Sequence, residues 1–438
     1  MTTHYESLFI GGKWVPPTSA ATIDVISAST EEQIGSVPRG MAADADAAVS
    51  AARAAFDDVQ GWSRWSPQQR AEAMNRFADE LEGRAEETVR RVSGQNGMPV
   101  SVGQQTEAVY PATLLRFYAN VALTQATEET RTSLVAGTTV VRREPIGVVA
   151  AIVPWNFPQS LTFFKVAPAL AAGCTVVLKP SSETVLDAFL VAEAAAAAGL
   201  PDGVLNIVTG SGREVGMRLV SSPGVDKVAF TGSTDAGRTI AEECGRLLRP
   251  VTLELGGKSA AILLDDVDLA ANMKSFYGSM LLNQGQTCFI STRILAPRNR
   301  YSEVVEAFTA LAKGLPVGDP FDPRTMIGPL ATSAQRDSVE GYIAQGIAEG
   351  GRVTAGGKRP KCLDRGWYVE PTIFADVDNA ATIAREEIFG PVLAVIPYED
   401  EEDAIAIAND SDYGLGGTVW TSDQDHGLAV ARRIQTGS

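Results

Sequence analysis

Apolar and polar positions follow two different patterns along this chain, and the pattern changes at about residue 145. Between residues 42 and 127, alanine-rich charged segments such as 44–56 and 68–91 place apolar residues three and four positions apart, which predicts amphipathic helices. Earlier, two short apolar runs within residues 8–15 meet at Gly11-Gly12, a pattern typical of a β-hairpin. Residues 131–143 combine β-branched and charged residues without a helical period, so they predict an extended ribbon outside the main core.

Beyond this ribbon, short apolar runs alternate with helical segments. The sequence predicts strands at 147–153, 175–178, 205–208, 227–230 and 251–255, and helices at 160–172, 186–198, 213–221 and 234–248. Near-continuous apolar strands between helices are typical of a parallel sheet covered on both faces. A second strand–helix series begins at Ser259. The pattern therefore predicts an α/β protein.

Composition narrows the class of protein. At 438 residues the chain is long enough for two or three domains of about 150 residues. A formal net charge of −16 argues against a surface for nucleic acid or anionic membrane. The first residues lack a basic stretch followed by an apolar one, and no apolar run approaches the roughly 20 residues of a membrane helix. Four widely spaced cysteines without a Cys-x-x-Cys pair predict reduced thiols in the cytoplasm and argue against zinc.

Cys288 is the candidate nucleophile, because it lies in a polar, glycine-containing stretch directly after an apolar run. A thiol attacks as its thiolate, and a free cysteine has a pKa of about 8.5, so a neighbouring base is needed. The two histidines, His4 and His426, lie outside any motif, which leaves the upstream carboxylate Glu254 as the candidate base. The alternative interpretation of Cys288 is a small buried hydrophobic residue.

Three stretches could bind a dinucleotide, but each of them alone is weak evidence. Gly210-Ser-Gly-Arg-Glu-Val-Gly216 follows a strand, but its last glycine comes one residue late for the usual fingerprint. Gly232 and Gly237 frame a hydroxyl-rich helix start that favours a diphosphate, and Lys179 closes an apolar strand. An ordinary capped helix and a surface lysine are the alternatives.

Taken together, these stretches resemble the aldehyde dehydrogenase superfamily, with matching order and spacing from near the N-terminus to the end of the chain. The motifs are Pro154-Trp-Asn-Phe-Pro158, Lys179-Pro-Ser, Phe230-Thr-Gly-Ser-Thr234, Leu253-Glu-Leu-Gly-Gly-Lys258, Gln284-Gly-Gln-Thr-Cys288 and Glu386-Glu-Ile-Phe-Gly-Pro-Val392.

The resemblance implies a role for each motif. Cys288 attacks the aldehyde, Asn156 and the backbone N–H of Cys288 form the oxyanion hole, and Glu254 activates the hydrolytic water. The cofactor, NAD or NADP, is held by residues from both halves of the chain: Trp155, Lys179, Ser182, Gly232, Ser233, Gly237, Leu255, Glu387 and Phe389. No residue is implied as a metal ligand.

The resemblance also implies a domain plan. Two Rossmann-like parallel-sheet domains are expected: a dinucleotide-binding domain at 1–125 and 145–256, and a catalytic domain at 257–438. Residues 126–144 form an oligomerisation ribbon, which predicts a homodimer or homotetramer. Because the family normally continues beyond this point into a strand, a glycine-rich turn and an extended arm, we expect the sequence to be a fragment that assembles poorly.

Two features bear on specificity. Ser182 occupies the position where members that prefer NAD usually carry a ribose-binding glutamate, and Glu183 follows it, so we expect NADP to be accepted as well as NAD. Phe289, Ile290 and residues 159–164 place no cation beside the cysteine, which favours uncharged aliphatic or aromatic aldehydes.

Glu254 favours an acid-forming enzyme over relatives that transfer the acyl group to coenzyme A. Two other function classes compete with an aldehyde dehydrogenase. A cysteine hydrolase would need the same base and oxyanion hole without a dinucleotide. A non-catalytic structural protein would be expected to have lost Cys288 or Glu254, and both are present.

Overall fold

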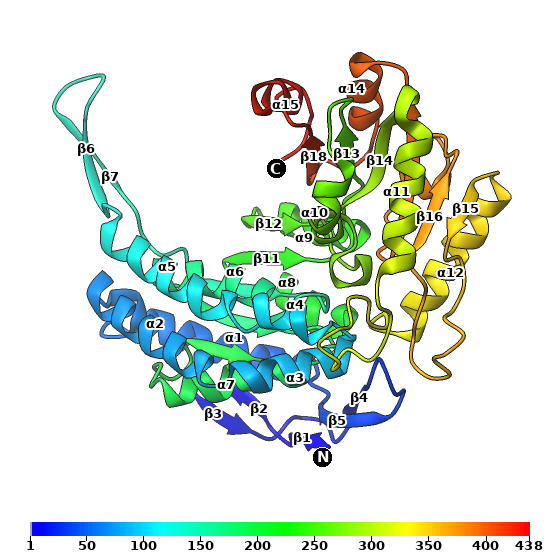
Figure 1. Cartoon of the computed structure of the whole chain (residues 1–438). Coiled ribbons are helices and arrows are strands. Elements are labelled where there is room, and N and C mark those ends of the chain that lie inside the picture. Colours follow the sequence, from blue (N-terminus) through cyan, green and yellow to red (C-terminus); the bar gives the residue numbers. More distant parts are fainter. Residues whose placement is uncertain (1) are drawn as a thin grey trace. The chain divides into compact units, whose positions relative to one another are not determined.

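The computed structural model describes residues 2–438, and its chain forms two compact units (Figure 1). Unit 1 comprises Met1–Ile26, Gln33–Val92 and Gly103–Glu254, and unit 2 comprises Ser27–Glu32, Ser93–Val102 and Leu255–Ser438. Two short segments from the N-terminal part of the chain therefore pack with unit 2, which the sequence alone did not suggest. The functional names of the two domains remain predictions.

A seven-stranded sheet forms the centre of unit 1. Its strands, in spatial order, are β12 (Val251–Glu254), β11 (Lys227–Thr231), β8 (Val148–Ile152), β9 (Thr175–Lys179), β10 (Leu205–Ile207), β2 (Leu8–Ile10) and β3 (Lys13–Val15). The first five are parallel, as the strand–helix rhythm predicts. The predicted hairpin turns at Gly11 (φ +62°) and Gly12 (φ +74°), and it adds to the sheet edge as an antiparallel pair.

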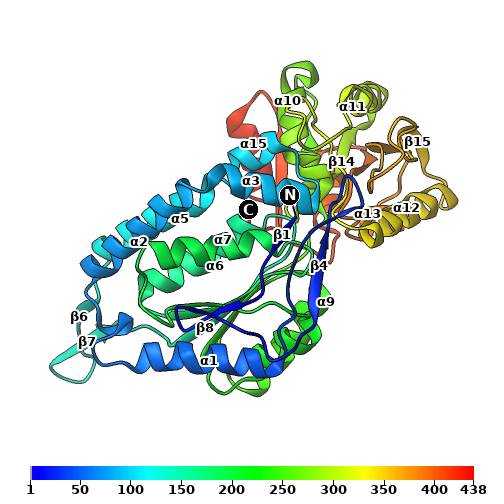
Figure 2. The same ribbon diagram turned by 90° about the horizontal axis from the view of Figure 1, so that it is seen from below.

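Helices cover both faces of this sheet (Figure 2). One face carries α1 (Ala42–Asp57), α8 (Met217–Ser221) and α9 (Thr234–Arg246). The other carries α6 (Pro158–Ala172) and α7 (Leu186–Ala197), with α2 (Pro67–Glu82) and α5 (Tyr110–Thr124) packed outside them. Buried aliphatic and aromatic residues, including Phe77, Phe163 and Val176, fill the space between these helices and the sheet.

Several helical boundaries differ from the prediction. The expected helix at 68–91 is two helices, because α2 ends at Glu82 with Gly83 as its C-cap, and α3 (Ala85–Asn96) begins after it; α4 (Val100–Gln105) follows. The expected helix at 213–221 begins with a π-helical turn at Gly212–Gly216, and only then continues as α8. A separate three-stranded sheet consists of β1 (Thr3–His4), β5 (Gln33–Pro38) and β4 (Thr22–Ile26).

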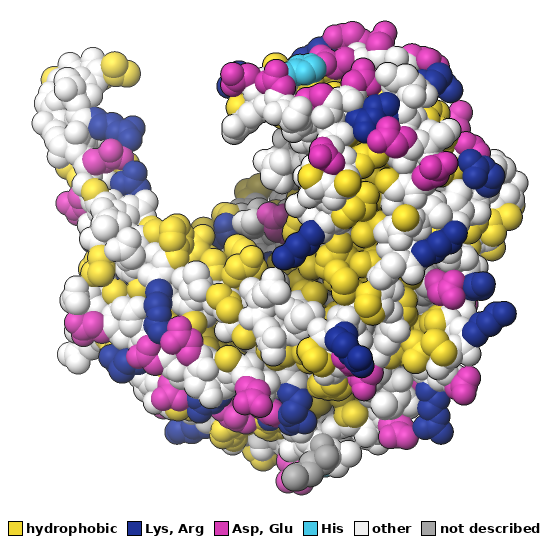
Figure 3. All heavy atoms as spheres, viewed as in Figure 1, with side chains coloured by type: hydrophobic (Ala, Val, Ile, Leu, Met, Phe, Trp, Pro, Cys, Tyr) yellow, Lys and Arg dark blue, Asp and Glu magenta, His cyan; other side chains and the backbone are white. Residues whose placement is uncertain are grey.

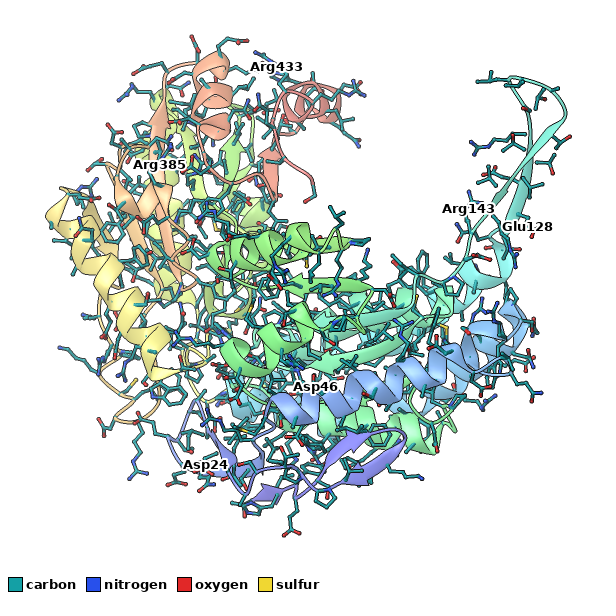
Figure 4. All side chains as sticks on the ribbon, turned by 180° about the vertical axis from the view of Figure 1, so that it is seen from behind. Asp24, Asp46, Glu128, Arg143, Arg385 and Arg433 are labelled. Atoms are coloured by element: carbon teal, nitrogen blue, oxygen red, sulfur yellow. The ribbon has the colours of Figure 1, made fainter. Side chains whose placement is uncertain are left out.

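Residues 131–143 belong to an extended hairpin, as predicted. Its strands β6 (Glu128–Thr132) and β7 (Thr138–Arg142) pair antiparallel and extend away from the end of α5 (Figure 1). Glu128 and Arg143 lie at the base of this ribbon (Figure 4), where the backbone N–H of Arg143 donates to the carbonyl of Thr127. Leu134 and Val135 at the tip are fully exposed.

Unit 2 contains a six-stranded sheet. In spatial order its strands are β15 (Arg352–Ala355), β16 (Thr372–Ala375), β17 (Val392–Tyr398), β14 (Ser291–Pro297), β13 (Ser259–Leu263) and β18 (Gly417–Trp420). All neighbours are parallel except β15 and β16. One face packs against α10 (Leu269–Met280) and α11 (Tyr301–Gly314); the other packs against α12 (Ser333–Ala348), α13 (Thr382–Arg385), α14 (Glu401–Asn409) and α15 (Gln424–Ala431).

Among residues 2–438, no helix has both the length and the apolar composition needed to cross a bilayer. No cluster of three or more His, Cys, Asp or Glu side chains among them is arranged to hold a metal ion.

Candidate active site

The loop before Cys288 has an unusual backbone. Asn283 (φ 52°, ψ 46°) and Gln284 (φ 57°, ψ 30°) are left-handed, and Gly285 (φ 76°) continues the reversal. For a residue other than glycine this conformation costs roughly 1–2 kcal/mol. Cys288 is half-buried, and the next residue, Phe289, is 51% exposed. The loop therefore presents the cysteine at a turn instead of sealing it in a core.

Buried amide side chains hold this strained loop in place. Nε2 of Gln284 donates to the carbonyls of Gly97 (3.1 Å) and Pro329 (3.0 Å). Oε1 of Gln286 accepts from the backbone N–H of Ala331 at 2.9 Å. Gly97 belongs to one of the N-terminal segments that pack with unit 2. The sequence motif contained both glutamines, but their partners are distant in the chain and only the fold reveals them.

Close backbone approaches explain the glycines around Cys288. A Cβ built on Gly257 would lie 2.3 Å from the carbonyl oxygen of Cys288, and one on Gly285 would lie 2.0 Å from the carbonyl oxygen of Gly390. The backbone N–H of Gly257 also donates to Oε1 of Glu387 at 3.1 Å. Unit 2 thus brings together Cys288, Gly257 and Glu387.

The buried cation Lys258 interacts electrostatically with Glu387. Lys258 is 2% exposed, and burial, reinforced by the charge of Arg293, lowers the pKa of Lys258 to about 7. Burial raises the pKa of Glu387, while the Gly257 amide and Lys258 act in the opposite direction. Nε of Arg293 donates to the carbonyl of Lys258 at 2.9 Å. The sequence analysis assigned no role to Lys258 or Arg293. The available signal was a charged residue directly before an apolar strand (Lys258) or inside one (Arg293).

Of the other two predicted unit 2 residues, Phe389 is left-handed (φ 55°), and its carbonyl accepts from Nε2 of Gln335 at 2.9 Å. Leu255 is half-buried and directly precedes the two glycines that approach Cys288 and Glu387.

In unit 1, four predicted site residues follow the ends of neighbouring parallel strands. Asn156 comes after β8, Lys179 ends β9, Gly232 comes after β11 and Glu254 ends β12. The carboxyl ends of parallel strands meet at one edge of a sheet, where α/β proteins bind ligands. Asn156 is buried, whereas the preceding Trp155 is half-buried and Glu254 is exposed. The carbonyl of Glu254 accepts from the N–H of Gly232 at 3.0 Å.

Lys179 is buried at this edge. Its Nζ donates to the carbonyl of Pro180 at 2.8 Å, and its side-chain stem lies beside Gly216, where a Cβ would stand 3.6 Å from Cδ. Burial lowers the pKa of Lys179 to about 8, and the nearby Glu183 acts in the opposite direction. Ser182 donates to the carbonyl of Gly210 at 3.4 Å.

The start of α9 presents polar groups next to Gly232. The exposed Ser233 caps the helix by accepting from the N–H of Ala236 at 3.4 Å, and the N–H of the buried Gly237 donates to the carbonyl of Ser233 at 2.9 Å. The positive end of a helix and a buried lysine on the same sheet edge fit a dinucleotide diphosphate. In contrast, the stretch from Gly210 to Gly216 forms a π-helical turn capped by Ser211.

Comparison with known proteins decides the family. The model of the aldehyde dehydrogenase family matches residues 14–438. The chain belongs to the aldehyde dehydrogenase family. It is 55% identical over 438 residues to geranial dehydrogenase from Castellaniella defragrans, covering 100% of this chain and 91% of the relative.

Solved structures of family members also match the chain over nearly its whole length. Aldehyde dehydrogenase from Mycobacterium tuberculosis, in complex with NAD+, has a TM-score of 0.96 at 50% identity, covering 100% of this chain and 90% of that one. A cysteine-to-alanine variant of aldehyde dehydrogenase C from Pseudomonas syringae, in complex with NAD+ and octanal, has a TM-score of 0.95 at 41% identity, covering 99% and 88%.

Membership confirms the resemblance and the α/β fold with two mainly parallel sheets. It also confirms that the chain is an oxidoreductase that oxidises aldehydes with a nicotinamide dinucleotide through a catalytic cysteine. Family membership does not by itself assign a role to each individual residue.

Proposed function

We propose that this chain oxidises uncharged, apolar aldehydes to carboxylic acids, with Cys288 as nucleophile, Glu254 as general base and Asn156 as oxyanion donor. The observation that carries the proposal is the strained loop of three left-handed residues, which holds a half-buried cysteine against the backbone of Gly257. Strain of this kind persists only where the surrounding structure fixes it, and it is concentrated at functional sites.

The chemistry proceeds in two stages on the cysteine. The thiolate of Cys288 attacks the aldehyde carbon, a C–S bond forms, and the oxyanion accepts hydrogen bonds from the side-chain amide of Asn156 and the N–H of Cys288. When bound, the nicotinamide ring supplies the acceptor for the hydride that leaves this carbon. Glu254 then takes a proton from water, which attacks the resulting thioester and releases the acid and the thiolate.

The predicted cofactor-binding residues would hold the dinucleotide. The N-terminus of α9, with Gly232, Ser233 and Gly237, suits the diphosphate, and Lys179 suits a ribose hydroxyl or a phosphate. Glu387 suits the nicotinamide ribose. Trp155, Ser182, Leu255 and Phe389 would supply the remaining contacts.

We further propose that NADP is accepted alongside NAD, because Ser182 replaces a carboxylate that would repel a 2′-phosphate. The neighbouring Glu183 is exposed, and its carboxylate accepts from the hydroxyl of Ser181.

Apolar surface supports the choice of substrate class. Phe164 is 51% exposed, and its ring stands 6.5 Å from that of Tyr110. Figure 3 shows hydrophobic side chains gathered over α5, which contributes the exposed Phe117 and Leu123. Geranial and octanal, named for two of the relatives, are uncharged and largely apolar aldehydes.

We also infer a cytoplasmic homo-oligomer in which the ribbon pairs with a second copy.

Substitution of the nucleophile and base tests the proposed function. Cys288→Ala should abolish reduced-nicotinamide formation and leave dinucleotide binding intact. Glu254→Gln should give a normal first turnover followed by a steady-state rate reduced by about 10²–10⁴-fold, because hydrolysis of the thioester loses its base. Absorbance of the reduced cofactor after rapid mixing with octanal measures both phases.

Two matched variants serve as controls. Cys362→Ala removes an exposed cysteine, and Glu242→Gln removes an exposed carboxylate on α9; both should retain the wild-type rates. Near-normal turnover of Cys288→Ala would refute the mechanism. Ester hydrolysis without any reduced cofactor from any aldehyde would instead favour a cysteine hydrolase.

A further inference from the structure

Glu107 is a completely buried carboxylate in unit 1 that the reaction described above does not use. It lies between α4 and α5 with 0% of its surface exposed. Its oxygens accept from the backbone N–H of Gln159 (2.8 Å) and from both the N–H (3.4 Å) and the hydroxyl (2.5 Å) of Ser160. Every hydrogen bond in this set comes from the first turn of α6.

A second buried carboxylate joins the same cluster. Asp187, 1% exposed in the first turn of α7, accepts from Nε2 of Gln159 at 2.8 Å, and its carbonyl accepts from the same nitrogen at 2.9 Å. Burial raises the pKa of Glu107 to about 7, opposed by the bonds from α6, and the charge of Asp187 raises it further. Placing two carboxylates so deep lowers the stability of the fold, and such groups are often retained for a specific purpose.

The start of α6 explains why a distant carboxylate is needed there. The N-cap residue is Phe157, which offers no side-chain acceptor, and Pro158 occupies the first helical position. The first-turn amides of a helix need an acceptor, which the N-cap side chain commonly provides. Glu107 supplies that acceptor from another part of the chain. It thereby fixes the turn that contains Asn156, which precedes the cap residue directly.

We propose that Glu107 is a positioning residue for Asn156: it anchors the first turn of α6 and so holds the Asn156 amide where the oxyanion develops. The inference rests on the proposed function, in which Asn156 is an oxyanion donor. Glu107 acts through Gln159 and Ser160 and itself contacts neither substrate nor cofactor.

A comparable carboxylate elsewhere in unit 1 provides a matched control. Asp44 is 3% exposed at the start of α1, and it accepts from the N–H of Met41 (2.8 Å) and from the N–H (2.9 Å) and hydroxyl (2.8 Å) of Thr18. Its burial is therefore similar to that of Glu107, and it accepts from the same kinds of donor, two backbone N–H groups and one hydroxyl, but its helix does not follow a predicted catalytic residue.

The test measures hydrolysis of an activated ester, p-nitrophenyl acetate, without dinucleotide, with rates expressed per titrated active-site thiol. Glu107→Gln replaces one acceptor oxygen with an amino group that faces N–H donors. We expect kcat to fall about 10- to 100-fold, the effect of displacing a catalytic group by up to about 1 Å, with KM within about threefold of wild type. Asp44→Asn should lower the melting temperature comparably and leave kcat within about twofold.

A double variant separates positioning from general damage. In an Asn156→Ala background, Glu107→Gln should cause less than about threefold further loss, because the group it positions is already absent. An equal loss in both backgrounds would overturn the inference. Ser160→Ala, which removes only the hydroxyl bond, should give a smaller loss in the same direction if Glu107→Gln fails to fold, and an unchanged kcat for this variant would also overturn it.

The outcomes distinguish this inference from the proposed function. If Asn156→Ala slows hydrolysis but Glu107→Gln does not, the positioning role alone is wrong. If Asn156→Ala leaves hydrolysis unchanged, the role of Asn156 as oxyanion donor is wrong and the inference falls with it.

Discussion

At the scale of single residues, the end of β9 shows how one side chain can set cofactor choice. Lys179 is buried there, and burial lowers its pKa to about 8, so most of its side chains are protonated at neutral pH. Ser182, three residues later, is half-buried and offers a hydroxyl where a carboxylate would repel a 2′-phosphate. No carboxylate at position 182 therefore repels the 2′-phosphate of NADP.

Substitution of this serine should change the cofactor preference. We expect Ser182→Glu to lower kcat/KM for NADP by at least about tenfold, or about 1.4 kcal/mol, and to leave kcat/KM for NAD within a few-fold. Ser338→Glu, which adds the same charge at an exposed position on α12, is the control. Initial rates with both cofactors make the measurement. A wild-type preference for NAD of about a thousandfold, some 4 kcal/mol, would contradict the expectation.

At the scale of elements, the nucleophile loop depends on contacts from three separate segments. Gln284 reaches the carbonyls of Gly97 and Pro329, and Gly285 passes directly over the carbonyl of Gly390. The energetic cost of the left-handed backbone is offset by buried hydrogen bonds, each worth about 0.5–1.5 kcal/mol. A change that prevents the close approach should release the loop.

Alanine substitution of two glycines tests this account. Gly285→Ala adds a methyl group 2.0 Å from a backbone oxygen at a positive φ, so we expect a loss of about 3 kcal/mol or more in unfolding free energy and a large loss of kcat. Gly278→Ala, on the exposed side of α10 with no atom within 4 Å of the new methyl group, should stabilise by about 0.5–1 kcal/mol. Thermal melts and steady-state rates compare them. Equal stability of the two variants would show that the loop is not held as described.

At the scale of the whole molecule, the ribbon is the feature that points to assembly. Its two strands are paired with each other only along one edge, and Leu134 and Val135 expose their full side chains at the tip. An exposed strand edge next to apolar side chains favours pairing with another chain.

Charge at the ribbon tip should weaken this assembly. The double substitution of Leu134 and Val135 by glutamate should shift the protein toward smaller species in sedimentation velocity, because burying either carboxylate in an interface is unfavourable. Val59→Glu, at an exposed loop position after α1, should leave the distribution unchanged. An unchanged mass for the ribbon variant, at concentrations where the wild-type protein associates, would show that the tip lies outside the interface.

The sequence by itself determined the repeated strand–helix order, the hairpin at Gly11-Gly12, the ribbon, and the motifs around Asn156, Lys179, Glu254 and Cys288. These depend on local periodicity, on turn chemistry and on short motifs, all of which are encoded within a few residues. Local patterns did not predict the π-helical turn at Gly212–Gly216 or the C-cap of α2 at Gly83, because small differences in local hydrogen bonding decide where a helix stops.

Only the tertiary structure decided which distant groups share an environment. The packing of Ser93–Val102 with unit 2, which gives Gln284 its partner at Gly97, joins residues nearly two hundred positions apart. Glu107 likewise looks like an ordinary surface acid in a helical sequence, yet the fold buries it completely at the start of α6. The physical reason is that burial, hydrogen-bond partners and pKa are properties of the surroundings, and the surroundings of these residues come from segments that chain order does not place beside them.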